Sequence, residues 1–124
     1  ENVILCLECH NWTMTDRLAS ALDLMERIHS KHFRMYWQPN QFVSQEANLA
    51  YAEKIAGYVD TIHVFNWRGN ERFPLSAGKD SWREYLGRFS GNETLLLEFM
   101  PDDSLDSLKT EADALLHLAG GMQS

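Results

Sequence analysis

The segment Asn2-Val-Ile-Leu-Cys-Leu-Glu-Cys-His10 decides the fold, because an unbroken apolar run leads directly into a carboxylate and an imidazole. An uninterrupted apolar strand is typical of a parallel sheet that is covered on both faces. Glu8 then lies where the apolar core meets solvent, and its charge requires a partner there. We therefore expect a parallel strand whose carboxyl end carries part of a functional site.

Three later segments repeat this pattern of an apolar strand with polar side chains at its end. They are Phe33–Trp37 followed by Gln38, Thr61–Phe65 with His63, and Thr94–Leu97 followed by Glu98. The carboxyl ends of parallel strands meet at one edge of a sheet. Glu8 and the three later polar residues are therefore predicted to converge.

Segments whose apolar residues recur at helical spacing separate the strands. Helices are expected over Thr15–Ser30, over Ser44–Ala56, from Ser81 onward, and from Asp102 to a stop at Gly120–Gly121. Ser81 and Glu84 have the spacing of a capping box, and Thr13 and Asp16 have a weaker form of it. Gly57 is the expected C-cap of the second helix.

The alternation repeats a strand–helix unit of about 30 residues four times, which predicts right-handed parallel βαβ units in one α/β domain over residues 1–124. Between the third strand and third helix, Asn66–Lys79 is predicted to be a long polar loop, and such loops are more often functional than idle. Four units could form a small doubly wound open sheet or half of a (β/α)8 barrel. Ligand-capable groups at every strand end favour the half-barrel.

Composition excludes several classes of protein. The 124 residues are 44% hydrophobic and 23% charged with a net charge of −7, which indicates a globular chain without a nucleic-acid surface. No stretch approaches the ~20 apolar residues of a membrane span, and the start does not resemble a signal peptide, so we predict a cytoplasmic protein. Cys6 and Cys9 have C-x-x-C spacing, but strand residues three apart face opposite sides. Both are expected to be ordinary buried thiols in a reducing compartment.

Five short motifs occur in a specific order: Leu7-Glu8-Cys-His10-Asn11, Tyr36-Trp-Gln-Pro-Asn40, Ile62-His-Val-Phe-Asn-Trp-Arg68, Gly78-Lys-Asp-Ser-Trp82 and Leu97-Glu98. Together they resemble the xylose-isomerase-like TIM barrels, the sugar (phosphate) isomerase/epimerase superfamily that also includes apurinic endonucleases. The resemblance spans the whole chain but only the C-terminal half of such a barrel, strands five to eight.

The resemblance implies a metal-assisted enzyme. In the ketose epimerases of this family, Glu, Asp, His and Glu hold a divalent metal (Mn, Mg, Co or Zn), and the two glutamates move a proton beside a carbonyl through an enediolate. By position, Glu8 and Glu98 match the glutamates, His63 matches the histidine, and Gln38, a neutral oxygen ligand, stands at the aspartate. The substrate-binding residues expected from the same comparison are His10, Asn11, Gln41 and Arg68.

The residues support this chemistry without the family, because two carboxylates with a cation between them supply base, acid and electrophile. Each residue also has a purely structural alternative: Glu8 could form an ion pair with an arginine, and His63 could be a hydrogen-bonded core histidine. The favoured function is an isomerase or epimerase acting on a small sugar or sugar phosphate. The alternative is a non-catalytic, carbohydrate-binding or self-assembling half-barrel that has lost its metal. The acidic charge disfavours phosphodiester cleavage.

A half-barrel has two unpaired strand edges, and such edges invite association. We therefore expect a fragment of a longer chain, or a homodimer in which two copies complete the barrel. Weak activity or none is expected from the chain by itself.

Overall fold

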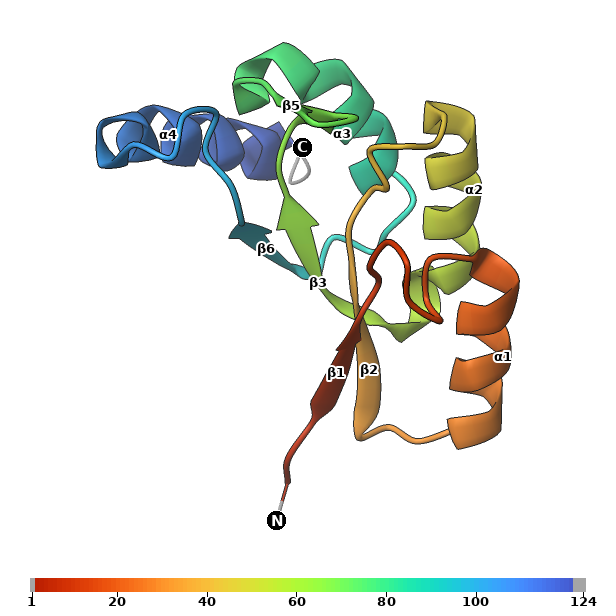
Figure 1. Cartoon of the computed structure of the whole chain (residues 1–124). Helices are drawn as coiled ribbons and strands as arrows, with labels where there is room; N and C mark the ends of the chain where they lie inside the picture. The colour runs from red at the N-terminus through yellow and green to blue at the C-terminus, as the bar shows by residue number, and fades with distance from the viewer. Residues whose placement is uncertain (1, 122–124) are drawn as a thin grey trace.

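Four strands form one parallel sheet in the computed structural model, which describes residues 2–121 (Figure 1). They are β1 (Leu5–Glu8), β2 (Phe33–Trp37), β3 (Val59–Val64) and β6 (Thr94–Leu97), and they lie side by side in chain order. The register places Glu8 opposite Tyr36 and His63 opposite Leu96. Within the described residues, β1 pairs only with β2 and β6 only with β3, so both edges of the sheet are open.

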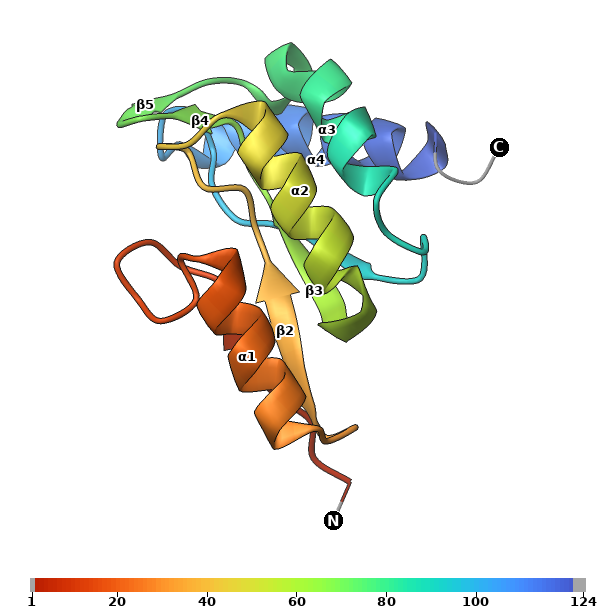
Figure 2. The ribbon, with the colours of Figure 1, turned by 90° about the vertical axis from the view of Figure 1, so that its right-hand side faces the viewer.

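A helix follows each strand of this sheet. The helices are α1 (Leu18–Ile28), α2 (Gln45–Ile55), α3 (Lys79–Leu86) and α4 (Leu105–Gly121), with short 3-10 turns η1 at Ala56–Tyr58 and η2 at Leu75–Gly78. Right-handed crossovers between neighbouring parallel strands place successive helices on one face, and consecutive helices accordingly contact one another. Figure 2 shows α1 and α2 in front of the strands. In the described part of the chain, no helix combines the length and apolar character needed to cross a bilayer.

The core lies between the helices and one face of the sheet. Met35, Trp37 and Ile62 point into it and are buried, and Trp37 packs edge-on against Trp82 and Tyr85 of α3. Because strand side chains alternate between faces, the residues between them face the other side of the sheet. This second face carries the polar strand-end residues.

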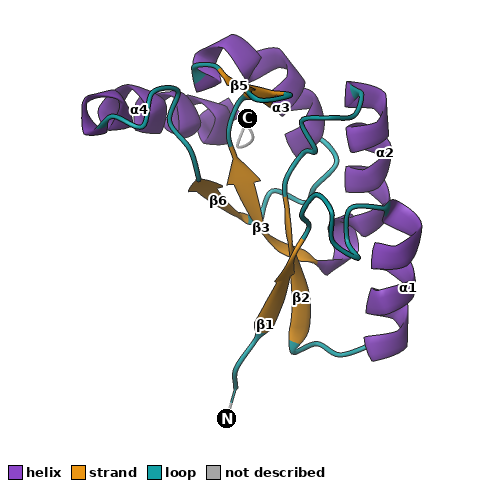
Figure 3. Ribbon diagram, in the orientation of Figure 1, coloured by secondary structure: helices purple, strands orange, loops and turns teal. Residues whose placement is uncertain are grey.

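The second face of the sheet is open, contrary to the expectation from the apolar run before Glu8. On the side of β1 and β2 away from α1, Figure 3 shows no helix. The residues Val3, Ile4 and Leu5 are 59%, 54% and 63% exposed. The apolar run before Glu8 is therefore exposed at one edge of the sheet, and it is not enclosed on both faces as expected.

The predicted N-terminal caps of two helices are wrong. Helix α1 begins at Leu18 after Arg17, without a side-chain cap, and the Thr13 hydroxyl instead donates to the His10 carbonyl. Helix α3 begins at Lys79 after Gly78, also without a side-chain cap. Ser81 therefore lies inside α3 and donates to the amide oxygen of Gln45 on α2 (2.8 Å), because tertiary packing offers it a partner.

The predicted C-cap of the second helix is also wrong. Helix α2 ends at Ile55 with Ala56 as its cap residue in a right-handed conformation, and Gly57 lies in η1 instead of capping the helix. Helix α4 extends to Gly121, the last residue that the structure describes, which is consistent with the predicted stop at Gly120–Gly121.

The segment predicted as a long loop contains its own structure. Strands β4 (Trp67–Arg68) and β5 (Glu71–Arg72) form an antiparallel hairpin around Gly69, whose φ of 57° favours glycine. The Gly69 N–H donates to the Gln41 carbonyl in the β2–α2 connection. Polarity indicated an exposed segment here, but the two-residue strands are too short to show a periodic pattern.

Candidate metal and acid–base site

The carboxyl ends of β1, β3 and β6 hold the three side chains that form the site. The ladder continues one residue beyond both edge strands, because the Cys9 N–H donates to the Tyr36 carbonyl (3.0 Å) and the Glu98 N–H to the Val64 carbonyl (3.2 Å). The Thr15 hydroxyl also donates to the Glu8 carbonyl (2.8 Å). The backbone at both glutamates is therefore held in place by neighbouring strands and by the β1–α1 connection.

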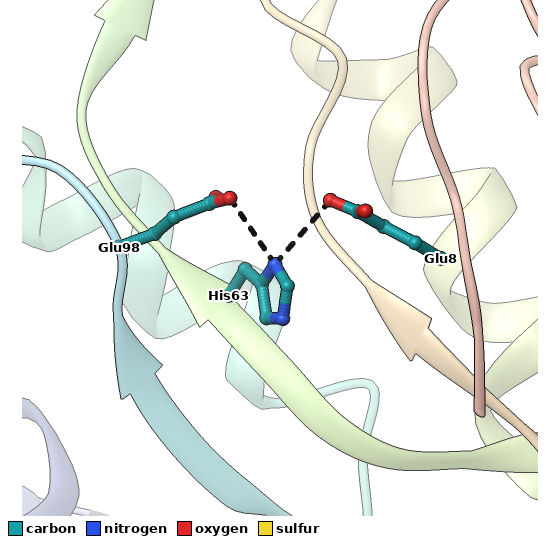
Figure 4. Close-up of side chains that lie close together, drawn as sticks. All are labelled: Glu8, His63 and Glu98. Carbon is teal, nitrogen blue, oxygen red and sulfur yellow. Dashed lines mark ion pairs between the residues drawn. The ribbon is translucent and has the colours of Figure 1, made fainter. Parts of the chain in front are cut away.

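The two glutamates approach the same nitrogen of His63 from opposite sides (Figure 4). The distance from His63 Nδ1 is 3.7 Å to Glu8 Oε1 and 3.5 Å to Glu98 Oε1. One ligand-capable atom from each residue lies within 4.8 Å of the others. Residues 90 positions apart in sequence are thus brought into one site, as the strand-end pattern predicts.

Gln38 completes the group from the end of β2. Its amide oxygen Oε1 lies 3.1 Å from His63 Nδ1, which is a hydrogen-bonding distance. Nδ1 therefore faces three oxygen atoms, from Glu8, Gln38 and Glu98. All four residues predicted as metal ligands meet at this nitrogen.

The polar atoms of the site are only partly satisfied by the protein. The side chain of His63 is 8% exposed, that of Glu98 is 23% exposed and that of Glu8 is 42% exposed. His63 Nε2 and Glu98 Oε2 are buried and have no hydrogen-bond partner. Buried polar atoms usually have partners, and each exception calls for an explanation such as an ion. Glu8 is paired with His63, and no arginine pairs with it among the described residues.

The donor atoms fit a divalent cation. Metal–oxygen distances of about 2.0–2.2 Å place neighbouring octahedral ligands about 3 Å apart and opposite ones about 4.2 Å apart. The separations of 3.1 to 3.7 Å around Nδ1 lie in this range. Carboxylate and amide oxygens are ligands of hard ions such as Mn²⁺, and an imidazole nitrogen is a ligand of transition metals such as Zn²⁺, so the mixed set of donors suits a divalent transition-metal ion.

The residues predicted to bind substrate line two neighbouring cavities. His10 and Asn11 line a cavity of about 190 Å³ together with Gln38, whereas Gln41 and Arg68 line one of about 230 Å³. The Asn11 side chain donates to the Gln41 amide oxygen (3.3 Å), which connects the two. Gln38 alone of the four metal-site residues lines either cavity. The Arg68 guanidinium lies over the Phe73 ring (5.1 Å) and is exposed.

Sequence reasoning missed two features of this edge of the sheet. The Tyr36 ring packs on His63 with ring centroids 5.0 Å apart, and no local pattern predicts this contact, because it depends on how β2 and β3 lie beside each other. Trp12 and Phe42, each four residues after a predicted ligand, form an aromatic pair with ring centroids 5.8 Å apart. Trp12 is 83% exposed with a φ of 60°, and no local pattern predicts that conformation.

Comparison with known protein families, curated proteins and solved structures gives no match for this chain. The functional assignment therefore depends on the geometry of the four converging side chains.

Proposed function

We propose that the chain carries the acid–base and metal-binding part of a sugar or sugar-phosphate isomerase or epimerase of the xylose-isomerase-like kind. The observation that carries this proposal is the meeting of Glu8, His63 and Glu98, with Gln38, at one edge of a parallel sheet. Two carboxylates on opposite sides of a reacting carbon are what proton removal and return require.

In this mechanism the glutamates act on a substrate seated between them. One carboxylate removes a proton from the carbon beside a carbonyl, and the other carboxyl group returns a proton to that carbon or its neighbour. A divalent ion held by the four side chains would polarise the carbonyl and stabilise the negative charge that develops on its oxygen. His63 and Gln38 do not exchange protons with the substrate. Their role would be to hold the divalent ion between the two glutamates.

The architecture supports a half-barrel. The strand order β1-β2-β3-β6 follows chain order, and a closed (β/α)8 barrel repeats this arrangement. Both open edges expose apolar side chains, such as Leu5 on β1 and Leu96 on β6, at 63% and 47%. We propose that a second copy of the chain closes the barrel, with β1 of each copy beside β6 of the other.

The neutral side chain of Gln38 favours a second candidate function. Its hydrogen bond to His63 Nδ1 satisfies the nitrogen without an ion. A carbohydrate-binding or self-assembling half-barrel without metal would retain the same strand ends. Metal binding separates the two candidates.

Thermal melting with MnCl2 or CoCl2 tests the metal site. At a metal concentration 100 times the Kd, binding stabilises the protein by about 2.7 kcal/mol, which corresponds to about 10 °C in Tm for a chain of this size. The variants His63→Ala and Glu98→Gln should lose this increase. Glu53→Gln, which removes the same charge from an exposed position on α2, should keep it. An unchanged Tm at millimolar metal would support the non-catalytic candidate.

Proton exchange tests the reaction itself and is more sensitive than product formation. A ketohexose or a ketohexose phosphate is incubated with the metal-loaded protein in D2O, and mass spectrometry follows deuterium at the carbon beside the carbonyl. We expect incorporation with the wild-type chain at high protein concentration and none with Glu8→Gln or Glu98→Gln. Incorporation that persists in both variants would remove the glutamates from the proton transfer.

A further inference from the structure

We infer that Gln38 sets the metal preference of this site, weakening the binding of Mg²⁺ relative to that of ions that bind strongly to imidazole nitrogen. The inference rests on the proposed function, since it requires that the four side chains bind a divalent ion. It concerns one neutral residue within a group otherwise built from carboxylates and an imidazole.

The contact between Gln38 and His63 is the first argument. Nδ1 is surrounded by three oxygen acceptors and lies 3.1 Å from the Gln38 amide oxygen, so without an ion this nitrogen carries the proton and donates it. The other ring nitrogen, Nε2, is buried without a partner. Gln38 therefore stabilises the tautomer of His63 with its proton on Nδ1, in which this nitrogen has no lone pair for a metal. An ion that binds Nδ1 must displace the proton and its hydrogen bond to Gln38.

The charge of the group is the second argument. Glu8 and Glu98 contribute two negative charges, and Gln38 contributes an oxygen without charge. Mg²⁺ is small, gives up water reluctantly and is bound chiefly through carboxylates, so one missing charge weakens its binding most. Co²⁺ and Zn²⁺ gain more from the imidazole nitrogen and follow the general order of affinity for nitrogen-containing sites.

The burial of the site strengthens this charge argument. The His63 side chain is 8% exposed and Glu98 Oε2 is buried without a partner, whereas the Glu8 and Glu98 side chains are 42% and 23% exposed, so an ion there would be partly shielded from solvent. Charges in such surroundings interact more strongly than charges in water. A carboxylate in place of the Gln38 amide should therefore have a large effect on Mg²⁺.

Calorimetric titration of Gln38→Glu tests the inference, with MgCl2, MnCl2 and CoCl2 as the probes. Glutamate has the length of glutamine and supplies the missing charge. We expect the wild-type chain to bind Co²⁺ at least a hundredfold more tightly than Mg²⁺, and the variant to reduce that ratio at least about tenfold. Gln45→Glu is the matched control, because it adds the same charge at the start of α2, where the side chain accepts from Ser81, and it should leave the ratio unchanged.

Nitrogen-15 NMR of the histidine rings gives an independent measurement on the wild-type chain. In the metal-free protein we expect the proton of His63 on Nδ1, and on addition of ZnCl2 we expect it on Nε2. The inference is overturned if the metal-free ring carries its proton on Nε2. It is also overturned if both glutamate variants change the ratio of Co²⁺ to Mg²⁺ affinity equally. Neither outcome contradicts the metal site itself. Absence of any metal binding in the wild type and in Gln38→Glu overturns both the inference and the proposed function.

Discussion

His63 shows how one residue takes its role from its neighbours. A single histidine in an apolar strand is most often a satisfied core residue, but the Nδ1 of His63 faces Glu8, Gln38 and Glu98. Its ring packs on Tyr36, and its second nitrogen has no partner. One ligand-capable atom of each of Glu8, His63 and Glu98 lies within 4.8 Å of the others, so these three side chains could hold a metal ion together.

Cys9, which directly follows Glu8, yields a prediction for alkaline pH. Burial raises the pKa of its thiol from 9.0 to about 11. Above pH 9 the unfolded chain releases this proton while the folded chain keeps it, so the free energy of unfolding should fall as pH rises from 9 to 11. Two pKa units correspond to a loss of about 2.7 kcal/mol.

Urea unfolding at pH 8, 9, 10 and 11 measures this loss. Other groups also titrate in this range, so the relevant quantity is the difference in pH dependence between the wild type and Cys9→Ala. The variant should lose less stability over the interval than the wild type does. Parallel curves for the two proteins would show that Cys9 does not cause the effect.

At the scale of elements, the β4–β5 hairpin connects two strand ends of the site edge. The Arg72 guanidinium lies 4.8 Å from the Trp67 ring centroid and 5.6 Å from that of Phe99, and it pairs with Asp103 after β6. The Gly69 N–H bonds to the β2–α2 connection on the other side. The hairpin therefore contacts and stabilises the two connections that follow Gln38 and Glu98.

Removing Arg72 should loosen the hairpin. Cation–π contacts of partly buried arginine contribute about 0.5–2 kcal/mol, so we expect Arg72→Ala to reduce stability by about 1 kcal/mol and to speed hydrogen exchange in the hairpin. Arg83→Ala on α3, where the ion pair with Asp80 is mostly exposed, is the matched control and should change little. Equal exchange rates in both variants would mean that Arg72 does not hold the hairpin.

At the scale of the whole molecule, the main features are the two open edges of the sheet and its uncovered face. The β1 edge exposes three consecutive apolar residues, Val3 to Leu5, while Leu105 and Leu116 of α4 are 80% and 68% exposed. Exposed strand edges and apolar patches of this kind commonly mark interfaces. The proposed two-fold closure would bury both edges in one interface.

Light scattering over a range of protein concentrations measures this closure. We expect a dimer at high concentration in the wild-type chain and a monomer in Leu5→Lys, which places a charge on the β1 edge. Met14→Lys, at a 70% exposed position in the β1–α1 connection, should still dimerise. A wild-type chain that stays monomeric at every concentration, or that associates as readily in Leu5→Lys, would contradict the proposal.

The amino-acid sequence by itself determined the local elements and the polar character of the strand ends. The predicted bounds of Phe33–Trp37 and Thr94–Leu97 are confirmed, and both segments are apolar runs of strand length between turn residues, which favours a strand over a helix. Parallel pairing of four strands in one α/β sheet is also confirmed. The helix after each strand supplies the crossover connection that parallel strands need.

Only the tertiary structure decided the features that depend on contacts between distant segments. Helix α3 begins away from its predicted cap, and Ser81 donates instead to Gln45 of the neighbouring helix α2. The separation of 3.5 Å between His63 and Glu98, and the turn of Gln38 toward the same nitrogen, follow from strand register and twist across the sheet. No local pattern contains that information, because it is set by which strands lie side by side and how far each is shifted along its neighbour.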